Sequence, residues 1–104
     1  MKPRPFPEVA IVGMHFRGAE VKALVSNFIP PLTLQLEREP DNRFDAFAIK
    51  AMYEGTHVGY IEAGQAAFIS PWMDQGHAFE ARVERMEQRR NNLHPICTVA
   101  PVEE

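Results

Sequence analysis

The 104-residue sequence contains one cysteine, Cys97, and therefore no pair that could form an internal disulfide. This excludes a small secreted protein held together by cross-links, and we expect a reducing, cytoplasmic location. Long apolar runs are also absent: the longest near the start, Val9 to Met14, is far shorter than the roughly 18 residues of a membrane-spanning helix, so no membrane partner is expected. Three prolines interrupt residues 1–7, which predicts an extended arm rather than a signal peptide.

The sequence has no excess of positive charge. Eleven lysines and arginines stand against 14 acidic residues, which gives a net charge of −3. This argues against a protein that coats a polyanion through bulk charge, but a small local site is compatible with it. The arm and the first loop hold Lys2, Arg4 and Arg17 against Glu8, so the average hides a basic segment.

Motifs for phosphate or metal binding are missing or incomplete. No Gly-Lys-Ser or Gly-Lys-Thr sequence follows a glycine-rich loop. Residues 41–45 begin like a calcium loop, but Arg43 stands where an oxygen ligand belongs. His94 and Cys97 have a spacing that suits a soft metal, yet a zinc site needs four ligands. Cys97 lies in an apolar segment, which predicts a buried thiol. We expect no metal, no cofactor and no enzymatic activity.

Two segments carry apolar side chains at the spacing of a helical face. The first covers Ala19 to Phe28, and Pro30-Pro31 ends it because proline lacks the amide donor. The second covers residues 62–75 and is ended by Gly76. The apolar stripe of this second helix is predicted to consist of Phe68, Ile69, Trp72 and Met73.

The remaining apolar pattern predicts strands. Leu32, Leu34 and Leu36 alternate with polar residues, so all three are expected to face a core. Segments 47–53 and 57–61 flank a short connection with a glycine, which predicts a hairpin. Further strands are predicted at 8–14, 79–84 and 96–99. We therefore expect one domain over residues 8–101, mainly β with two short helices, forming a small α+β or barrel-like body.

Three ordered segments resemble the HIRAN domain. They are Ile11-Val12-Gly13-Met14-His15-Phe16, the run from Leu36 to Lys50, and Val58-Gly59-Tyr60-Ile61. The family shows a Val-Gly end to its first strand, an Arg-Glu-Pro-Asn-Asn-Pro-Tyr-Asp type segment and a Val-Gly-Tyr or Val-Gly-His strand. The resemblance covers roughly Val9 to Asp74, and the middle segment is long enough to be specific.

The resemblance implies a modified oligonucleotide-binding-like six-stranded barrel. It also implies non-catalytic binding of single-stranded DNA ends, with recognition of the 3′-hydroxyl terminus, in DNA repair, replication or processing. A DNA-processing protein is the further partner that it implies. Carried over by position, the DNA-binding residues are His15 and Phe16 beside the terminal bases, Asp41 and Asn42 near the backbone, Phe44 under a base, Asp45 at the 3′-hydroxyl and Tyr60 lining the groove. Arg43 replaces the proline that is usual in the family and Arg17 lies one residue past Phe16, so both are counted with the DNA-binding residues as places to which positive charge has moved.

Physical chemistry supports these roles independently. Stacking of a base on an aromatic ring contributes about 1–3 kcal/mol to binding, whatever the identity of the base. Phe16 and Phe44 could both provide such a ring. A carboxylate repels a phosphodiester but accepts a hydrogen bond from a terminal hydroxyl, so Asp45 could select ends over interiors.

Some residues differ from the family pattern, and the candidate residues also have simpler structural explanations. The family commonly has arginine at His15, lysines at Glu62 and Ala63, and asparagine at Phe47, so weaker and more salt-sensitive binding is expected. Phe16 and Phe44 could be ordinary core aromatics. The Asp and Asn residues of the loop build turns in any case. The alternative function is a protein-protein interaction module that keeps the barrel without DNA binding.

Overall fold

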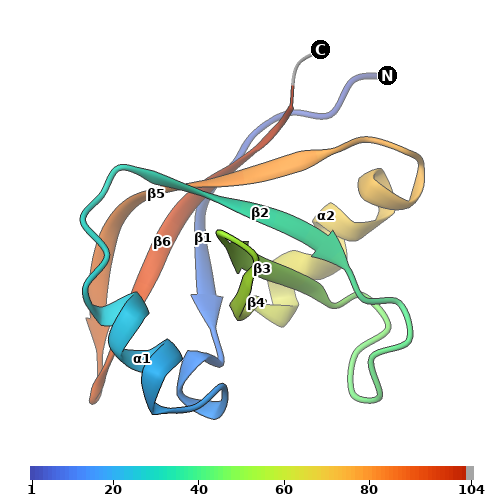
Figure 1. The fold of residues 1–104 in the computed structure, drawn as a ribbon. Helices are drawn as coiled ribbons and strands as arrows, with labels where there is room; N and C mark the ends of the chain where they lie inside the picture. The colour runs from blue at the N-terminus through green and yellow to red at the C-terminus, as the bar shows by residue number, and fades with distance from the viewer. Residues whose placement is uncertain (103–104) are drawn as a thin grey trace.

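The protein is a closed antiparallel barrel of six strands with two helices (Figure 1). The computed structural model describes residues 1–102. Around the barrel the strands follow the order β1-β4-β3-β2-β5-β6, and each is antiparallel to its neighbours. The elements are β1 Phe6–Val12, a 3-10 helix η1 Met14–Phe16, α1 Ala19–Ser26, β2 Leu32–Arg38, β3 Ile49–Tyr53, β4 Thr56–Ile61, α2 Ala63–Asp74, β5 Phe79–Arg89 and β6 Asn92–Pro101.

The first strand is shifted relative to the prediction. It starts at Phe6 instead of residue 8, so the extended arm is shorter than predicted, and it ends at Val12. Gly13 stops it because its φ of 82° turns the chain into η1, a conformation that glycine adopts without a steric penalty. Met14, predicted to belong to the strand, is instead a buried core residue of η1.

The two hairpins differ in how well the sequence predicts them. Glu54 and Gly55 both have positive φ, so the predicted β3–β4 hairpin closes with a tight two-residue turn. The β5–β6 hairpin is longer than predicted, since its strands pair as far as Arg89 with Asn92. Residues 88–92, which lie between the predicted strands 79–84 and 96–99, thus form the ends of two strands and the turn between them. Polar residues are tolerated here because most of their side chains face solvent.

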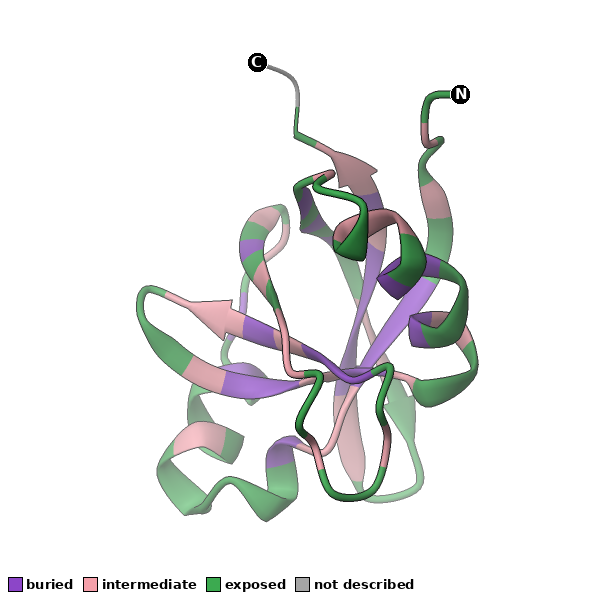
Figure 2. Ribbon diagram, turned by 90° about the vertical axis from the view of Figure 1, so that its right-hand side faces the viewer, coloured by how far each residue is buried: buried purple, intermediate pink, exposed green. Residues whose placement is uncertain are grey.

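The core lies inside the barrel and beneath the two helices (Figure 2). Leu34 is fully buried, while Leu32 and Leu36 pack against the core with partial exposure, as the alternating pattern predicts. Cys97 is also buried, and loss of solvent raises the pKa of its thiol to about 12. The prediction of a buried thiol is confirmed.

The apolar stripe predicted for α2 is wrong at one position. Ala66, Ile69 and Ser70 face the barrel, with Trp72 and Met73 packed at the edge of the core. Phe68 points elsewhere and is 71% exposed. Successive residues of a helix are rotated by about 100° around its axis. Phe68 therefore points away from the buried face on which its neighbour Ile69 lies, although both side chains are apolar.

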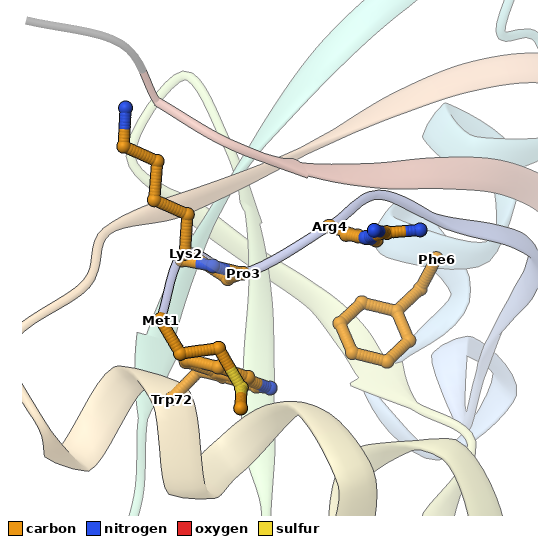
Figure 3. A pocket seen from close by; sticks show the side chains of 6 residues that line it. All are labelled: Met1, Lys2, Pro3, Arg4, Phe6 and Trp72. Atoms are coloured by element: carbon orange, nitrogen blue, oxygen red, sulfur yellow. The ribbon is translucent and has the colours of Figure 1, made fainter.

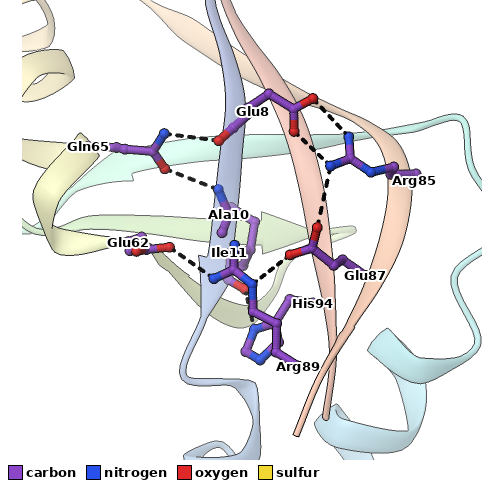
Figure 4. Close-up of polar contacts among 9 residues, drawn as sticks. All are labelled: Glu8, Ala10, Ile11, Glu62, Gln65, Arg85, Glu87, Arg89 and His94. Carbon is purple, nitrogen blue, oxygen red and sulfur yellow. Dashed lines mark hydrogen bonds and ion pairs between the residues drawn. The ribbon is translucent and has the colours of Figure 1, made fainter.

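Two predicted absences concern membranes and metals. No helix within residues 1–102 is both long and apolar enough to cross a membrane. In the same described range no group of three or more His, Cys, Asp and Glu side chains is placed to hold a metal ion. The ring of His94 is instead buried, with Nδ1 3.0 Å from the carbonyl oxygen of Ile11 (Figure 4).

The barrel closes tightly where β4 passes β1. These strands pair through Val12 with Tyr60 and through Ile11 with Ile61. A Cβ placed on Gly59 would lie 2.6 Å from the carbonyl oxygen of Val12. Glycine is therefore the residue that permits the two backbones to approach at this point.

We predict that Gly59→Ala lowers the free energy of unfolding by about 1–3 kcal/mol, as overpacking of a tight contact does. The clash involves a backbone oxygen of β1, so a rotamer change cannot relieve it. Gly64→Ala is the matched control, because the Cβ would enter open space on α2 and alanine favours a helix. Urea denaturation followed by Trp72 fluorescence measures both; equal stability of the two variants would contradict the prediction.

Candidate nucleic-acid interface

The loop between β2 and β3, residues 39–48, is organised by its own side chains. Oδ1 of Asn42 accepts hydrogen bonds from the backbone amides of Phe44 at 2.9 Å and Asp45 at 3.0 Å. Oδ1 of Asp45 in turn accepts one from the amide of Phe47 at 2.9 Å. The predicted turn-forming role of these residues is confirmed. Within residues 1–102, Oδ2 of Asp45 has no hydrogen-bond partner, so a second role is compatible with the first.

Arg38 fixes the base of this loop from the end of β2. Its guanidinium donates to the carbonyl oxygens of Ala48 at 2.7 Å and Ala46 at 2.9 Å. Nε also donates to Oδ1 of Asp74 at 2.8 Å, and this contact holds the pKa of that carboxyl below its usual range. The loop is thereby tied to the C-terminal end of α2. Sequence reasoning missed this role because Arg38 and Asp74 lie in different predicted elements.

Glu39 connects the loop to β4. One carboxylate oxygen accepts hydrogen bonds from Nδ2 of Asn42 at 2.6 Å and from the hydroxyl of Tyr60 at 2.8 Å. These two bonds hold the pKa of Glu39 below its usual value, and partial burial together with the bond to Glu39 raises the pKa of Tyr60. Glu39 therefore positions two of the predicted site residues relative to each other.

A cavity of about 250 Å³ opens between this loop, β4 and the start of α2. Among the predicted site residues it is lined by Asn42, Phe44, Asp45 and Tyr60. The ring of Phe44 is 94% exposed, which rules out a core role for it. The lining that the sequence did not indicate is apolar and comes from Val12, Ala48, Ile61 and Ala63.

The other loop residues lie outside this cavity. Asp41 and Arg43 line a separate hollow together with Glu39, Asn42 and Phe44. Both are exposed. Phe47, which stands where the family commonly has asparagine, is 49% exposed and supplies its backbone amide to the loop. The loop's internal bonding is therefore intact despite that replacement.

Two of the predicted site residues, His15 and Phe16, lie in η1, and Arg17 directly follows it. Phe16 is 82% exposed, and its ring centroid lies 4.0 Å from that of His15. Neither residue lines the 250 Å³ cavity. Burial and then the positive charge of Arg17 lower the pKa of His57, whose ring packs edge-on against Tyr60 at 4.8 Å. Arg17 is thus close enough to the His57–Tyr60 side of the cavity to act on it electrostatically.

The acidic residue Glu62 is part of a surface ion-pair network (Figure 4). It lies 3.3 Å from Arg89, which also pairs with Glu87 at 2.7 Å. The network continues through Arg85 to Glu8. The carboxylate that stands where the family commonly has lysine is therefore partly compensated by a cation from β5.

We predict that Glu39→Ala loosens the loop, whereas Glu39→Gln preserves it, because the Gln carbonyl oxygen can still accept from Asn42 and Tyr60. Amide hydrogen exchange of Phe44 and Asp45 reports this directly, and equal protection in the two variants would refute the positioning role.

The same network predicts a pH dependence. A carboxyl whose pKa is lowered by folding stabilises the protein above its unfolded pKa, and that contribution disappears as pH falls through the folded pKa, below 4.5 for Glu39. Unfolding free energies at about pH 7 and about pH 3 should therefore differ less in Glu39→Gln than in the parent protein. An unchanged difference would assign the acid sensitivity to other carboxylates.

Comparisons of the sequence and the structure with known proteins identify the family of this chain. The HIRAN domain family model matches residues 7–99. A protein from Lactobacillus plantarum is similar in structure, with 23% identity, a TM-score of 0.73 and coverage of 93% of this chain and 95% of that one. The HIRAN domain of human HLTF is similar with 19% identity, a TM-score of 0.72 and coverage of 94% and 74%. No curated protein sequence matches the chain. The chain belongs to the HIRAN family, which is known as a family of DNA-binding domains.

Proposed function

We propose that this domain binds single-stranded DNA ends without catalysis and recognises the 3′-hydroxyl terminus, in DNA repair, replication or processing. The observation that carries the proposal is the pairing of an exposed aromatic ring, Phe44, with the Asp45 carboxylate in the lining of one apolar cavity. The family supports DNA as the ligand class. The chemistry of the cavity supports the proposed recognition of the 3′-hydroxyl terminus.

The cavity suits a terminal nucleotide. Its walls at Val12, Ala48 and Ala63 are apolar and small, which leaves room for a flat base beside the ring of Phe44. Phe16 and His15 offer a second exposed aromatic surface on η1 for a neighbouring base. Stacking is independent of base identity, so the site would read ends and not sequence.

In this proposal, Asp45 distinguishes a 3′-hydroxyl end from a 3′-phosphate or a continuing strand. One of its oxygens holds the loop, and the other is available to accept a hydrogen bond from a hydroxyl. A 3′-phosphate or a continuing phosphodiester would place negative charge against this carboxylate. Arg17, whose charge acts on Tyr60, and Arg43, which lines the neighbouring hollow with Asn42 and Phe44, provide positive charge for the preceding phosphates.

A protein-interaction module is the second candidate. It is favoured by the net charge of −3 and by the apolar, exposed rings of Phe16, Phe44 and Phe47, which a protein partner could also cover. A protein-interaction module of this kind is predicted not to bind DNA even at low salt, where electrostatic attraction is greatest.

The proposal predicts a preference for one end chemistry. An oligonucleotide with a 3′-hydroxyl should bind about tenfold to a hundredfold more tightly than the same strand with a 3′-phosphate, since a hydrogen bond to a charged group contributes about 1.5–3 kcal/mol. Asp45→Asn keeps an oxygen for Phe47 but removes the charge, so it should narrow the preference. Fluorescence anisotropy measures all four affinities. Equal binding of both ends by the parent protein would remove the assigned role of Asp45.

Loss of either exposed ring should weaken binding. Phe44→Ala and Phe16→Ala each remove a surface on which a base can stack, so the dissociation constant should rise about 5- to 160-fold, equivalent to about 1–3 kcal/mol. Ile29→Ala is the matched control, because Ile29 is 83% exposed but lines a hollow beside α1 instead of the 250 Å³ cavity. Thermal melting should be similar in all three variants. An affinity unchanged by both phenylalanine substitutions would contradict stacking.

A further inference from the structure

The exposed face of α2 is apolar along most of its length. The side chains on this face that carry neither charge nor hydrogen-bonding groups are Ala63, Gly64, Ala67, Phe68 and Pro71, all exposed. Phe68 is the large one, at 71% exposure. The face begins at the candidate site, because Ala63 lines the same cavity as Phe44 and Asp45.

A second cavity lies at the other end of the same helix. It has a volume of about 590 Å³ and is lined by Met1, Lys2, Pro3, Arg4, Phe6 and Trp72. Figure 3 shows the arm passing above α2, with the side chain of Met1 against that of Trp72. Lys2 and Arg4 are exposed, and neither forms an ion pair within residues 1–102. Aromatic surface and positive charge therefore occur together here.

Phe68 lies between the two cavities. It follows Gly64 by four residues and precedes Trp72 by four, so the three positions are neighbours along one side of the helix. The Cβ position of Gly64 has nothing within 4 Å, which leaves this stretch open beside the ring. Twelve helical residues span about 18 Å, a distance that several nucleotides can cover.

The acidic groups at the two ends of this path are already paired. Asp74, the one carboxylate of α2, accepts from Arg38 at 2.8 Å, and Glu62 lies 3.3 Å from Arg89. A polyanion that follows the helix would therefore meet neutral surface and then the cations of the arm. An apolar protein partner would gain nothing from Lys2 and Arg4, whereas phosphates pair with them and bases stack on aromatic rings.

We infer that the exposed face of α2 and the N-terminal arm form a second binding surface for single-stranded nucleic acid, continuous with the candidate cavity, in which Phe68 and Trp72 contact bases and Lys2 and Arg4 contact phosphates. The inference rests on the proposed function, because it describes where a strand held at the cavity continues. It assigns a role to a segment that lies at the opposite end of the barrel from the 39–48 loop (Figure 1).

The test compares oligonucleotides of about four and about ten nucleotides with the same 3′-hydroxyl end, lengths that bracket common site sizes. The parent protein should bind the longer strand more tightly. Phe68→Ala, and the double variant Lys2→Ala with Arg4→Ala, should lose about fivefold or more of this gain and leave the shorter strand unaffected. The double variant should also reduce the slope of log affinity against log salt by about 1.4, since each phosphate contact on a single strand contributes about 0.7.

The control has the same loss of charge away from this surface. Arg82→Ala combined with Arg90→Ala removes two exposed cations of the β5–β6 hairpin, and it should change neither the length dependence nor the local salt slope beyond a small general effect.

Three outcomes would overturn the inference while keeping the proposed function: no gain with length, a gain that both variants retain, or variants that change self-association in sedimentation experiments but leave DNA affinity unaltered. Failure of the parent protein to bind either strand would instead refute the proposed function.

Discussion

The close approach of β1 and β4 at Gly59 positions the rest of the site. Because Gly59 has no side chain, the backbone of β4 can lie against the carbonyl of Val12, and Tyr60 pairs with that residue. The Tyr60 hydroxyl then reaches Glu39, Glu39 holds Asn42, and Asn42 holds the amides of Phe44 and Asp45. A backbone constraint inside the barrel is thus transmitted through four hydrogen bonds to the residues that face the cavity. The separation of these segments in the sequence is irrelevant once the strands have paired.

The pairing of the acidic residues makes a net charge of −3 compatible with the proposed nucleic-acid site. Glu39 accepts from Tyr60 and Asn42, Glu8 from Arg85, and Asp74 from Arg38, so these carboxylates are occupied by partners within the fold. The electrostatic potential that an approaching polyanion meets depends on which local charges are paired. The net charge does not show this, because it counts paired and unpaired groups alike. The composition argues against binding of a polyanion through bulk charge, but it carries little information about the charge at a single cavity.

The sequence predicted the elements whose signal is local. The alternation of Leu32, Leu34 and Leu36, the turn at Glu54 and Gly55 and the two helices all follow from spacing within a few residues. The length of the β5–β6 hairpin was missed because Gln88 and Arg89 are polar, and their pairing with β6 depends on a partner strand and not on their own pattern. Phe68 was misplaced for a related reason, since only the position of the barrel decides which side of α2 is covered.

At the candidate site, residue types were predictable and connections were not. The Asp-Asn loop and the phenylalanines beside it stand out in the sequence, but their exposure became known only from the structure. The roles of Glu39 and Arg38 depend on contacts 21 and 36 residues away. Asp45 shows why two readings of one residue need not compete. Its Oδ1 accepts a hydrogen bond from the amide of Phe47, while its Oδ2 has no partner among residues 1–102 and is the oxygen that the proposed function assigns to the terminal hydroxyl. Because the turn already fixes the carboxylate, accepting a terminal hydroxyl would require little reorganisation, and the binding free energy would not be reduced by ordering the loop.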